Sequence, residues 1–320
     1  MQASPDISFV LPVYNKADIL PAVLRALAAQ TIDAQAEFIF VDDASTDGSL
    51  PLLQDRTAGL PRARVVANSQ NAGPSIRLNQ GAALAAGRYL CLLDADELVA
   101  PNAIATMLHL LRDHAAPMVH GKVAITDQPG ESFIPPALPS SPPFALLSPV
   151  LPALLGNRGF VRMCWLVETG LFRSAGGCDP RLFIQDEALP LRLALSAARM
   201  VDLQAPATYA PPARKRLSAD KGQQHHDRFF AHYLLFRDHP ELPPVLQRQL
   251  TRKCMSTAWK AVRSDNSGRH RLAVFFRYAA SRLGPLSVPE KWLAESVAYF
   301  AARPGIRRTP EFSEKGLARV

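Results

Sequence analysis

Short apolar runs alternate with amphipathic segments through the first third of the chain, and this pattern constrains the fold more than any other feature. Between the first two runs, Ile19, Val23 and Leu27 recur at the spacing of one helix face. Strands that alternate with helices pair into a parallel sheet covered by helices. The sequence therefore predicts an α/β fold with a Rossmann-like, mainly parallel sheet whose ligands bind where the strands end. The expected strands are residues 7–13, 37–42, 64–67 and 88–93.

The regular alternation stops after a helix expected near residues 101–113. Residues 129–152 contain eight prolines, each of which removes a backbone donor, so we expect neither a strand nor an uninterrupted helix there. Beyond residue 210 the sequence shows amphipathic segments and no strand pattern. We therefore predict two parts, residues 1–210 and a mostly helical C-terminal region, residues 211–320. The helices of this region are expected near residues 222–237, 243–263, 268–282 and 289–302.

Charge is unevenly distributed along the 320 residues, whose net charge is +8. Residues 211–320 hold 21 Lys and Arg against 9 Asp and Glu, so the C-terminal region is strongly basic. No aromatic-basic recognition motif or zinc spacing accompanies this charge, so nucleic acid is not an expected partner. An anionic membrane surface is a better-motivated partner, and a merely solvated basic face is the alternative.

Composition excludes several other classes of protein. Hydrophobic residues make up 48% and charged residues 20% of the chain, which excludes intrinsic disorder. The four cysteines form no C-x-x-C pair, so we expect buried thiols rather than a zinc or redox site. No stretch approaches the roughly 18 apolar residues of a membrane span, and the first residues lack a signal-peptide pattern. We therefore expect a cytoplasmic protein.

Two carboxylates follow the fourth expected strand in Leu92-Leu93-Asp94-Ala95-Asp96. Carboxylates placed this close repel one another unless a cation lies between them, so the pattern favours a hard divalent metal with oxygen ligands, Mg²⁺ or Mn²⁺. Such an ion commonly takes substrate phosphates as further ligands, which makes a diphosphate a natural partner. The alternative is an ordinary acidic turn before the helix that begins near residue 101.

Two further carboxylates, Asp42 and Asp43, end the second expected strand. A carboxylate at this position can accept a hydrogen bond from a nucleobase or a ribose hydroxyl, whereas Asp47 is better explained as a helix cap. Tyr14 and Asn15 follow the first strand and add an aromatic ring and an amide at the same edge. A nucleobase can stack on that ring.

The order of four segments is more specific than any one of them. In order they are FVLPVYN, FVDDASTDGS, the stretch from Asn71 through Gly73 to Asn79, and GRYLCLLDAD. Together they closely resemble the inverting family 2 glycosyltransferases with the GT-A fold, strongly over residues 7–100 and more weakly to about residue 195. The resemblance implies a nucleoside-diphosphate sugar donor, with a UDP-sugar expected, and Mg²⁺ or Mn²⁺ held by Asp94 and Asp96. The implied nucleotide-sugar contacts are Pro12, Tyr14, Asn15, Asp42, Asp43, Gly73, Arg77, Asn79, Asp94 and Ala95.

A later segment, from Gly177 to Glu187, resembles the family stretch that ends in an acidic Glu-Asp pair at a helix start. In the family, the Asp of this pair is the general base, which implies that role for Asp186, with Glu187 as the fallback. Here Gln185 stands in the Glu position, which raises the alternative of an impaired or inactive enzyme. A second alternative is that Asp186 and Glu187 only complement the helix N-terminus.

Many relatives carry a histidine shortly after a tyrosine near the end of this domain, and Tyr209 lacks one. The cations that follow it, Arg214, Lys215 and Arg216, are candidates to bind the diphosphate instead, and a solvated basic linker is the alternative. Farther on, we expect His225 and His226 to lie on a helix surface.

These features predict a metal-dependent inverting glycosyltransferase that acts on an acceptor hydroxyl in cell-surface glycan or glycolipid synthesis. The acceptor is expected to be a glycan or a lipid-linked molecule, with residues 129–152 on the acceptor side of the cleft. The enzyme is expected in the cytoplasm, attached peripherally to the inner face of the membrane. One alternative is a GT-A-like protein that binds nucleotide sugar without transferring it. The other is a nucleotidyltransferase, although LPVYNKAD is not the basic glycine-rich loop expected of one.

Overall fold

The computed structural model describes residues 4–127, 130, 132–156, 163–212, 220–264, 268–283 and 288–311. Within these residues, the strands form one nine-stranded sheet in the order β3-β2-β1-β4-β8-β6-β9-β5, with β7 paired to β9. The strands are β1 Ile7–Val13, β2 Ala36–Asp42, β3 Ala63–Ala67, β4 Tyr89–Leu92, β5 Leu98–Val99, β6 Met118–Ile125, β7 Phe144–Leu147, β8 Trp165–Glu168 and β9 Met200–Ala210.

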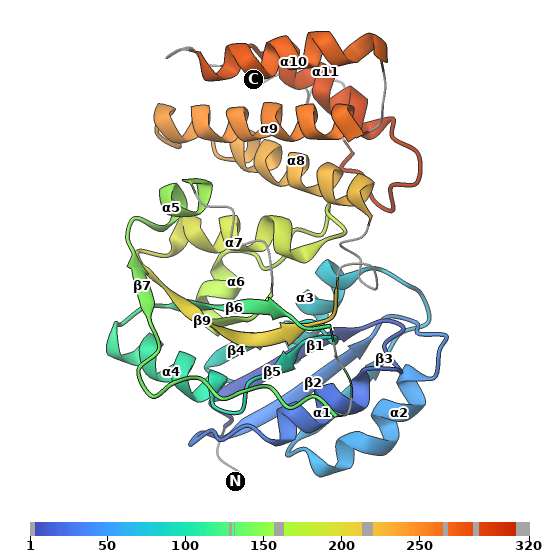
Figure 1. Ribbon diagram of the computed structural model, residues 1–320, viewed down its shortest axis with the longest axis vertical. Helices are drawn as coiled ribbons and strands as arrows, with labels where there is room; N and C mark the ends of the chain where they lie inside the picture. Colours follow the sequence, from blue (N-terminus) through green and yellow to red (C-terminus); the bar gives the residue numbers. More distant parts are fainter. Residues whose placement is uncertain are drawn as a thin grey trace.

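Helices cover the sheet, and the C-terminal helices form a further layer beyond it (Figure 1). The helices of the first part are α1 Leu20–Ala28, α2 Ser49–Arg56, α3 Pro74–Leu84, α4 Ala103–Asp113, α5 Val150–Gly156, α6 Thr169–Ser174 and α7 Gln185–Ser196, with a short 3-10 turn at Thr57–Gly59. The C-terminal helices are α8 Lys221–Asp238, α9 Pro244–Ser264, α10 Gly268–Arg282 and α11 Glu290–Ala301.

The first four strands form the parallel part of the sheet, as predicted. β1 lies between β2 and β4, with Ile7 opposite both Ala36 and Tyr89. Parallel strands covered on both faces are apolar throughout, which explains the continuous run in β1. The carboxyl ends of β1, β2 and β4 therefore lie at one edge. The rest of the sheet is mixed, because β8 runs antiparallel to β4 and β6, while β9 runs parallel to β6.

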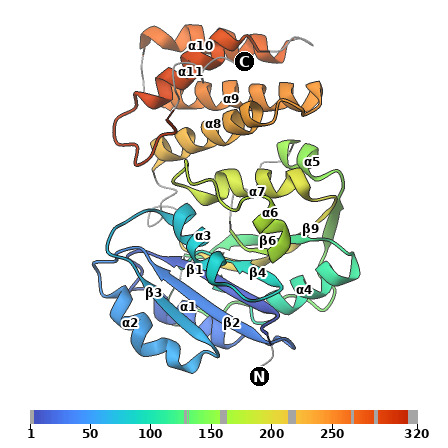
Figure 2. The same cartoon turned by 180° about the vertical axis from the view of Figure 1, so that it is seen from behind.

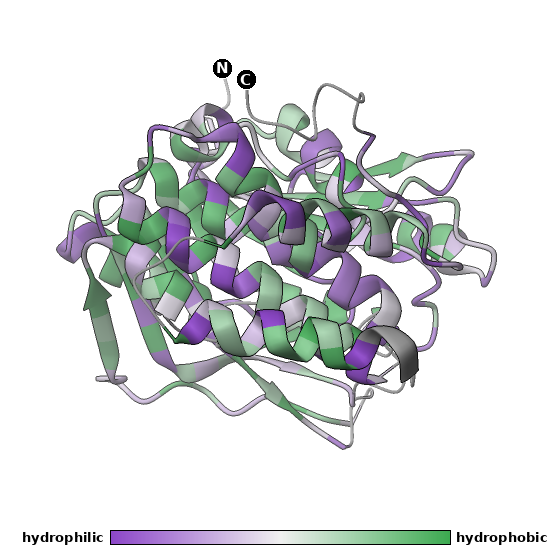
Figure 3. Ribbon diagram, turned by 90° about the horizontal axis from the view of Figure 1, so that it is seen from above, coloured by the Kyte–Doolittle hydropathy of each residue, from purple (hydrophilic) through white to green (hydrophobic). Residues whose placement is uncertain are grey.

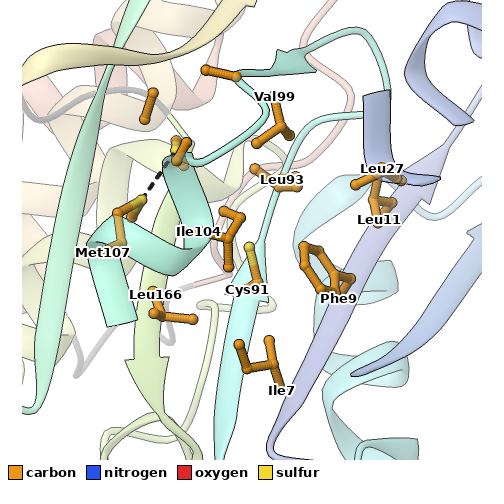
Figure 4. Close-up of a cluster of buried hydrophobic side chains, with 14 of the residues drawn as sticks. Ile7, Phe9, Leu11, Leu27, Cys91, Leu93, Val99, Ile104, Met107 and Leu166 are labelled. Carbon is orange, nitrogen blue, oxygen red and sulfur yellow. Dashed lines mark hydrogen bonds between the residues drawn. The ribbon is translucent and has the colours of Figure 1, made fainter. Parts of the chain in front are cut away.

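Apolar side chains from β1, β4 and α4 interlock in the core on one face of the sheet. Phe9 on β1 and Cys91 on β4 are fully buried, and Ile104 and Met107 approach them from α4 (Figure 4). All four cysteines are buried free thiols, as expected, and burial raises their pKa. A rigid core of this kind fixes the positions at which the strands end.

The proline-rich segment is more regular than predicted. It contains the strand β7, which pairs with β9, and the helix α5 begins at Val150 within it. The expectation of neither strand nor helix was wrong because the prolines flank β7 rather than interrupt it. Pro152 lies in the first turn of α5, where a missing backbone donor costs no hydrogen bond.

The C-terminal helices begin and end within two residues of their predicted bounds, and α8 packs against α7 of the first part. α7 lies between the sheet and α8 in both views (Figure 1, Figure 2). One apolar cluster joins Leu182 and Ala188 of the first part to Phe229, Phe230 and Phe300 of the C-terminal region. The two parts therefore share a core.

Hydrophilic and hydrophobic residues alternate along the C-terminal helices when they are viewed from above (Figure 3). The surface position predicted for His226 was wrong, because its ring is fully buried and its Nδ1 lies 2.7 Å from Asp227 Oδ1. Among the described residues, no helix combines the length and the apolar character needed to cross a bilayer.

Candidate active site

A cleft of about 1050 Å³ opens between the carboxyl ends of the strands, the start of α7 and the C-terminal helices. Its walls come from residues that lie far apart in the sequence. The predicted site residues that line it are Pro12, Tyr14, Asn15, Asp43, Asp94, Ala95, Asp96, Asp186 and Glu187. The structure therefore brings the expected metal carboxylates and the expected base to one cleft.

The turns after β1 and β2 hold each other in place. Asn15 donates its backbone N–H to Ser45 Oγ at 3.1 Å and accepts from the Thr46 backbone N–H at 2.8 Å. The backbone of Asn15 is left-handed, with φ of 50°, a conformation that asparagine tolerates better than most residues. Tyr14, the preceding residue, is 40% exposed in the cleft. These hydrogen bonds therefore hold the turn that carries the Tyr14 ring.

Asp43 is the centre of a buried hydrogen-bond network. Its carboxylate accepts from the backbone N–H groups of Ala72 at 2.7 Å and Gly73 at 2.8 Å, and from Arg77 Nε at 2.6 Å. Arg77 is only 7% exposed and lies outside the cleft lining. Asp43 and Arg77, for which contacts to ribose and diphosphate were expected, therefore bind one another and fix the loop before α3.

Three further predicted contacts lie behind the cleft wall, as Arg77 does and Asp43 does not. Asp42 is fully buried, and its Oδ2 accepts from the Ser45 backbone N–H at 3.1 Å. Asn79 forms two hydrogen bonds of 2.8 Å with the backbone of Cys178. Gly73 has φ of 84°, and a Cβ there would lie 2.5 Å from the Phe183 ring. None of these three predicted residues lines the cleft.

The two carboxylates after β4 already have protein partners. Asp96 is 4% exposed, and its Oδ2 lies 2.5 Å from Lys16 Nζ. Asp94 Oδ1 accepts a hydrogen bond of 2.8 Å from Gln185 Nε2. The amide of Gln185 thus connects the strand end to the start of α7. A glutamate at that position would place a second carboxylate against Asp94.

The residues of this corner fit a divalent ion that arrives with a diphosphate. No group of three or more His, Cys, Asp or Glu side chains in the described ranges is placed to hold a metal. However, Mg²⁺ in nucleotide sites is commonly held by one or two carboxylates together with substrate phosphates. Asp96 already forms an ion pair with a cation, the Lys16 ammonium. Asp94 and Asp96 would hold the ion, and Lys16 would have to leave Asp96.

Asp186 and Glu187 lie side by side in the first turn of α7 but in different surroundings. Glu187 is 4% exposed and accepts two hydrogen bonds from Arg228, at 2.9 and 2.7 Å. Burial raises the pKa of Glu187, and the Arg228 guanidinium opposes that rise. Asp186 is only partly buried, in the lining of the cleft. This geometry favours Asp186 over Glu187 as a base that meets a substrate.

The C-terminal helices supply a wall of the cleft that the sequence did not predict. Arg228 and His232 of α8, several residues of α9 and Arg282 of α10 line it. Helical spacing in the sequence defines a face of α9, but it does not show which neighbour that face meets. The predicted diphosphate cations Arg214, Lys215 and Arg216 lie outside the described residues.

The chain also returns to the sheet domain after α11. Arg307 lines the cleft, with its guanidinium 4.9 Å from the centre of the Phe183 ring. Arg308 donates to the carbonyl oxygens of Pro180 and Leu182. Burial lowers the pKa of Arg308. This segment therefore closes the cleft beside Phe183.

The fold and the cleft define a class: a GT-A type α/β domain with a helical C-terminal region. Residues 8–157, just under half of the chain, match the model of Glycosyl transferase family 2. The resemblance inferred from the sequence motifs is confirmed. Three curated relatives, two of them described as uncharacterized glycosyltransferases from Escherichia coli and Haemophilus influenzae, are matched over only 29 to 51% of their own length.

One of these relatives is the succinoglycan biosynthesis protein ExoO of Rhizobium meliloti, 36% identical over 105 residues, which are 32% of this chain and 29% of that protein. Residues 1–349 of S. aureus TarS, solved with UDP-GlcNAc, superpose with a TM-score of 0.68 at 15% identity, covering 91% of this chain and 83% of that one. The mannosyltransferase PcManGT of Pyrobaculum calidifontis, solved with GDP-Man and Mn²⁺, gives 0.58 at 19% identity, covering 95% and 82%. At these identities the two structures show the fold.

Proposed function

We propose that this chain is a metal-dependent inverting glycosyltransferase that moves a sugar from a nucleoside-diphosphate sugar, with a UDP-sugar as the first donor to test. The observation that carries the proposal is the single cleft, which contains both the Asp94–Asp96 pair and Asp186. Donors of this class are bound in the two solved structures of similar fold. The family 2 domain supports transfer as the reaction.

Each part of the cleft has a role in this proposal. The Tyr14 ring stacks on the base of the donor, and Asp94 and Asp96 are the residues that would hold Mg²⁺ or Mn²⁺. When bound, the ion stabilises the charge that develops on the diphosphate leaving group. Asp186 accepts the proton of the attacking hydroxyl, which is a poor nucleophile at neutral pH. A single displacement from the face opposite the leaving group inverts the anomeric carbon and needs only this one base.

A second candidate is a protein that binds nucleotide sugar without transferring it. The observation that favours it is the hydrogen bond between Gln185 and Asp94, where the family has an acidic residue in the Gln185 position. The nucleotidyltransferase alternative gains no comparable support from the cleft.

The acceptor and the location of the enzyme belong to the same proposal. A glycan or lipid-linked acceptor in cell-surface glycan or glycolipid synthesis agrees with the name of the succinoglycan relative. Such an acceptor places the enzyme in the cytoplasm at the inner face of the membrane. The basic C-terminal region would favour peripheral attachment there.

Calorimetry with a panel of nucleotides tests donor binding. We expect at least one of UDP, GDP and dTDP to bind, and Mn²⁺ to tighten that binding, because Asp94 and Asp96 would hold an ion that offsets the charge of the diphosphate. The matching nucleoside monophosphate is the control, since it lacks the second phosphate. If no diphosphate binds, with or without Mn²⁺, both the transferase and the binding-only proposals fail.

A further inference from the structure

The cleft is electrostatically divided. Every acidic residue in the described part of its lining belongs to the sheet domain, and these residues are Asp43, Asp94, Asp96, Asp186 and Glu187. The described residues of the C-terminal region contribute no carboxylate to the lining, only neutral and basic side chains. A cleft wall with one sign of charge attracts and orients a ligand of the opposite sign.

Two of the basic or titratable groups on this wall add no net positive charge. Arg228 is paired with Glu187, whose carboxylate it meets through two hydrogen bonds. Burial lowers the pKa of His232 to about 4, so this ring is neutral at neutral pH. The other basic residues of this wall are Arg252, Lys253 and Lys260 of α9, Arg282 of α10, and Arg307.

The α9 residues in the lining follow helical spacing. Arg252, Ser256 and Lys260 are four residues apart, and Lys253 and Thr257 repeat the same interval one position later. These residues share one face of the helix and span about 12 Å along its axis. Cationic groups thus lie at both ends of the face, with two hydroxyl groups between them.

This face belongs to the side of the cleft away from the expected nucleotide position. α9 packs against α5 and α8, and Leu154 and Leu155 of α5 line the same side. Tyr14 and Asn15 lie at the opposite side, on the turn after β1. The helix α7, whose first turn holds Asp186, lies between β1 and α9 in the fold (Figure 1). The α9 face therefore meets whatever approaches Asp186 from the acceptor side.

We infer that the acceptor carries phosphate, and that the α9 face binds this phosphate while an acceptor hydroxyl reaches Asp186. The inference rests on the proposed glycosyl transfer. Phosphate oxygens accept from Arg, Lys and hydroxyl donors arranged around a tetrahedral group, which matches the α9 side chains. A phosphodiester polymer and a lipid-linked phosphate offer the same chemistry.

The test compares acceptors that differ only in phosphate. Ribitol 5-phosphate and its phosphodiester-linked oligomers are matched with ribitol, and a short polyprenyl-diphosphate-linked saccharide in detergent represents the lipid source. We expect the phosphorylated acceptors to raise nucleoside diphosphate release about tenfold or more over the neutral acceptor. Preference for the oligomer indicates a polymer, and preference for the lipid-linked saccharide indicates a lipid source.

A charge-matched pair of variants locates the effect. Lys253→Gln with Lys260→Gln is expected to raise the KM for the phosphorylated acceptor about tenfold or more and to leave donor affinity unchanged. The control is Arg271→Gln with Lys291→Gln, which removes two charges from exposed positions of α10 and α11. Lys260→Arg, which keeps the charge, should retain most of the effect, and thermal melts verify that each variant is folded.

Several outcomes overturn the inference. Equal use of phosphorylated and neutral acceptors does so, as does an equal effect of the cleft and control variants. The same holds if the cleft variant loses binding to anionic vesicles but keeps its acceptor kinetics, because the α9 face would then contact a membrane. Failure of donor binding is a separate result, and it overturns the proposed function itself.

Discussion

Asp186→Asn is expected to lower kcat about a thousandfold while leaving the dissociation constant of the nucleotide sugar unchanged. Asparagine keeps the size and shape of the side chain but accepts no proton from the attacking hydroxyl. Asp186 lies at the start of α7, apart from the Tyr14 turn where the nucleotide is expected to bind. Steady-state kinetics together with calorimetry separate the two effects.

Glu187→Gln is the neighbouring control for this prediction. This substitution removes the negative charge that pairs with Arg228, so we expect lower stability in urea denaturation. The loss of kcat should be smaller than that of Asp186→Asn. If Asp186→Asn stays active while Glu187→Gln is inactive at full folding, the base is Glu187. If the unaltered protein binds donor but releases no nucleoside diphosphate with any acceptor, the binding-only alternative replaces the transferase.

Asp96→Ala is expected to remove most of the gain in donor affinity that Mn²⁺ gives, a change of about a hundredfold. The physical reason is that Asp96 is one of two carboxylates after β4 proposed to hold the ion. Chelation with EDTA should abolish turnover in the unaltered enzyme, and added Mn²⁺ or Mg²⁺ should restore it. Donor titrations at several metal concentrations measure the effect.

Lys16→Met is the matched variant, with the opposite sign. In the structure the Lys16 ammonium forms an ion pair with Asp96. Removing this ammonium should therefore lower the metal concentration needed for half-maximal donor binding. If Lys16→Met instead weakens donor binding as much as Asp96→Ala does, and EDTA has no effect, then Lys16 itself binds the diphosphate. The metal part of the proposal would then be wrong.

The sequence predicted the strands and helices that depend mainly on the local pattern of apolar residues. The parallel strands β1 to β4 appear where continuous apolar runs stood, and α8 to α11 appear where helical periodicity stood. The strands β6 and β9 were missed because they pair across long distances in the chain, as Val119 does with Val201. Such pairing depends on tertiary contacts that a single sequence does not display.

For the site, likewise, the sequence predicted some features and missed others. Motifs predicted that Tyr14, Asp94 and Asp186 belong to one site, and the structure places all three in the cleft lining. They did not predict that Asp43 would bind Arg77, because a motif identifies a residue without identifying its partner. The α9 wall carries no motif, since its role depends on which face of the helix meets the cleft.

The anomeric configuration of the first product tests the central claim most directly. With an α-linked UDP-sugar and no acceptor, water replaces the acceptor hydroxyl, and ¹H NMR at early times resolves the anomer released before mutarotation. Single displacement with Asp186 as base predicts the β-anomer first, at a rate that Asp186→Asn abolishes. Release of the α-anomer first would contradict an inverting mechanism with one base.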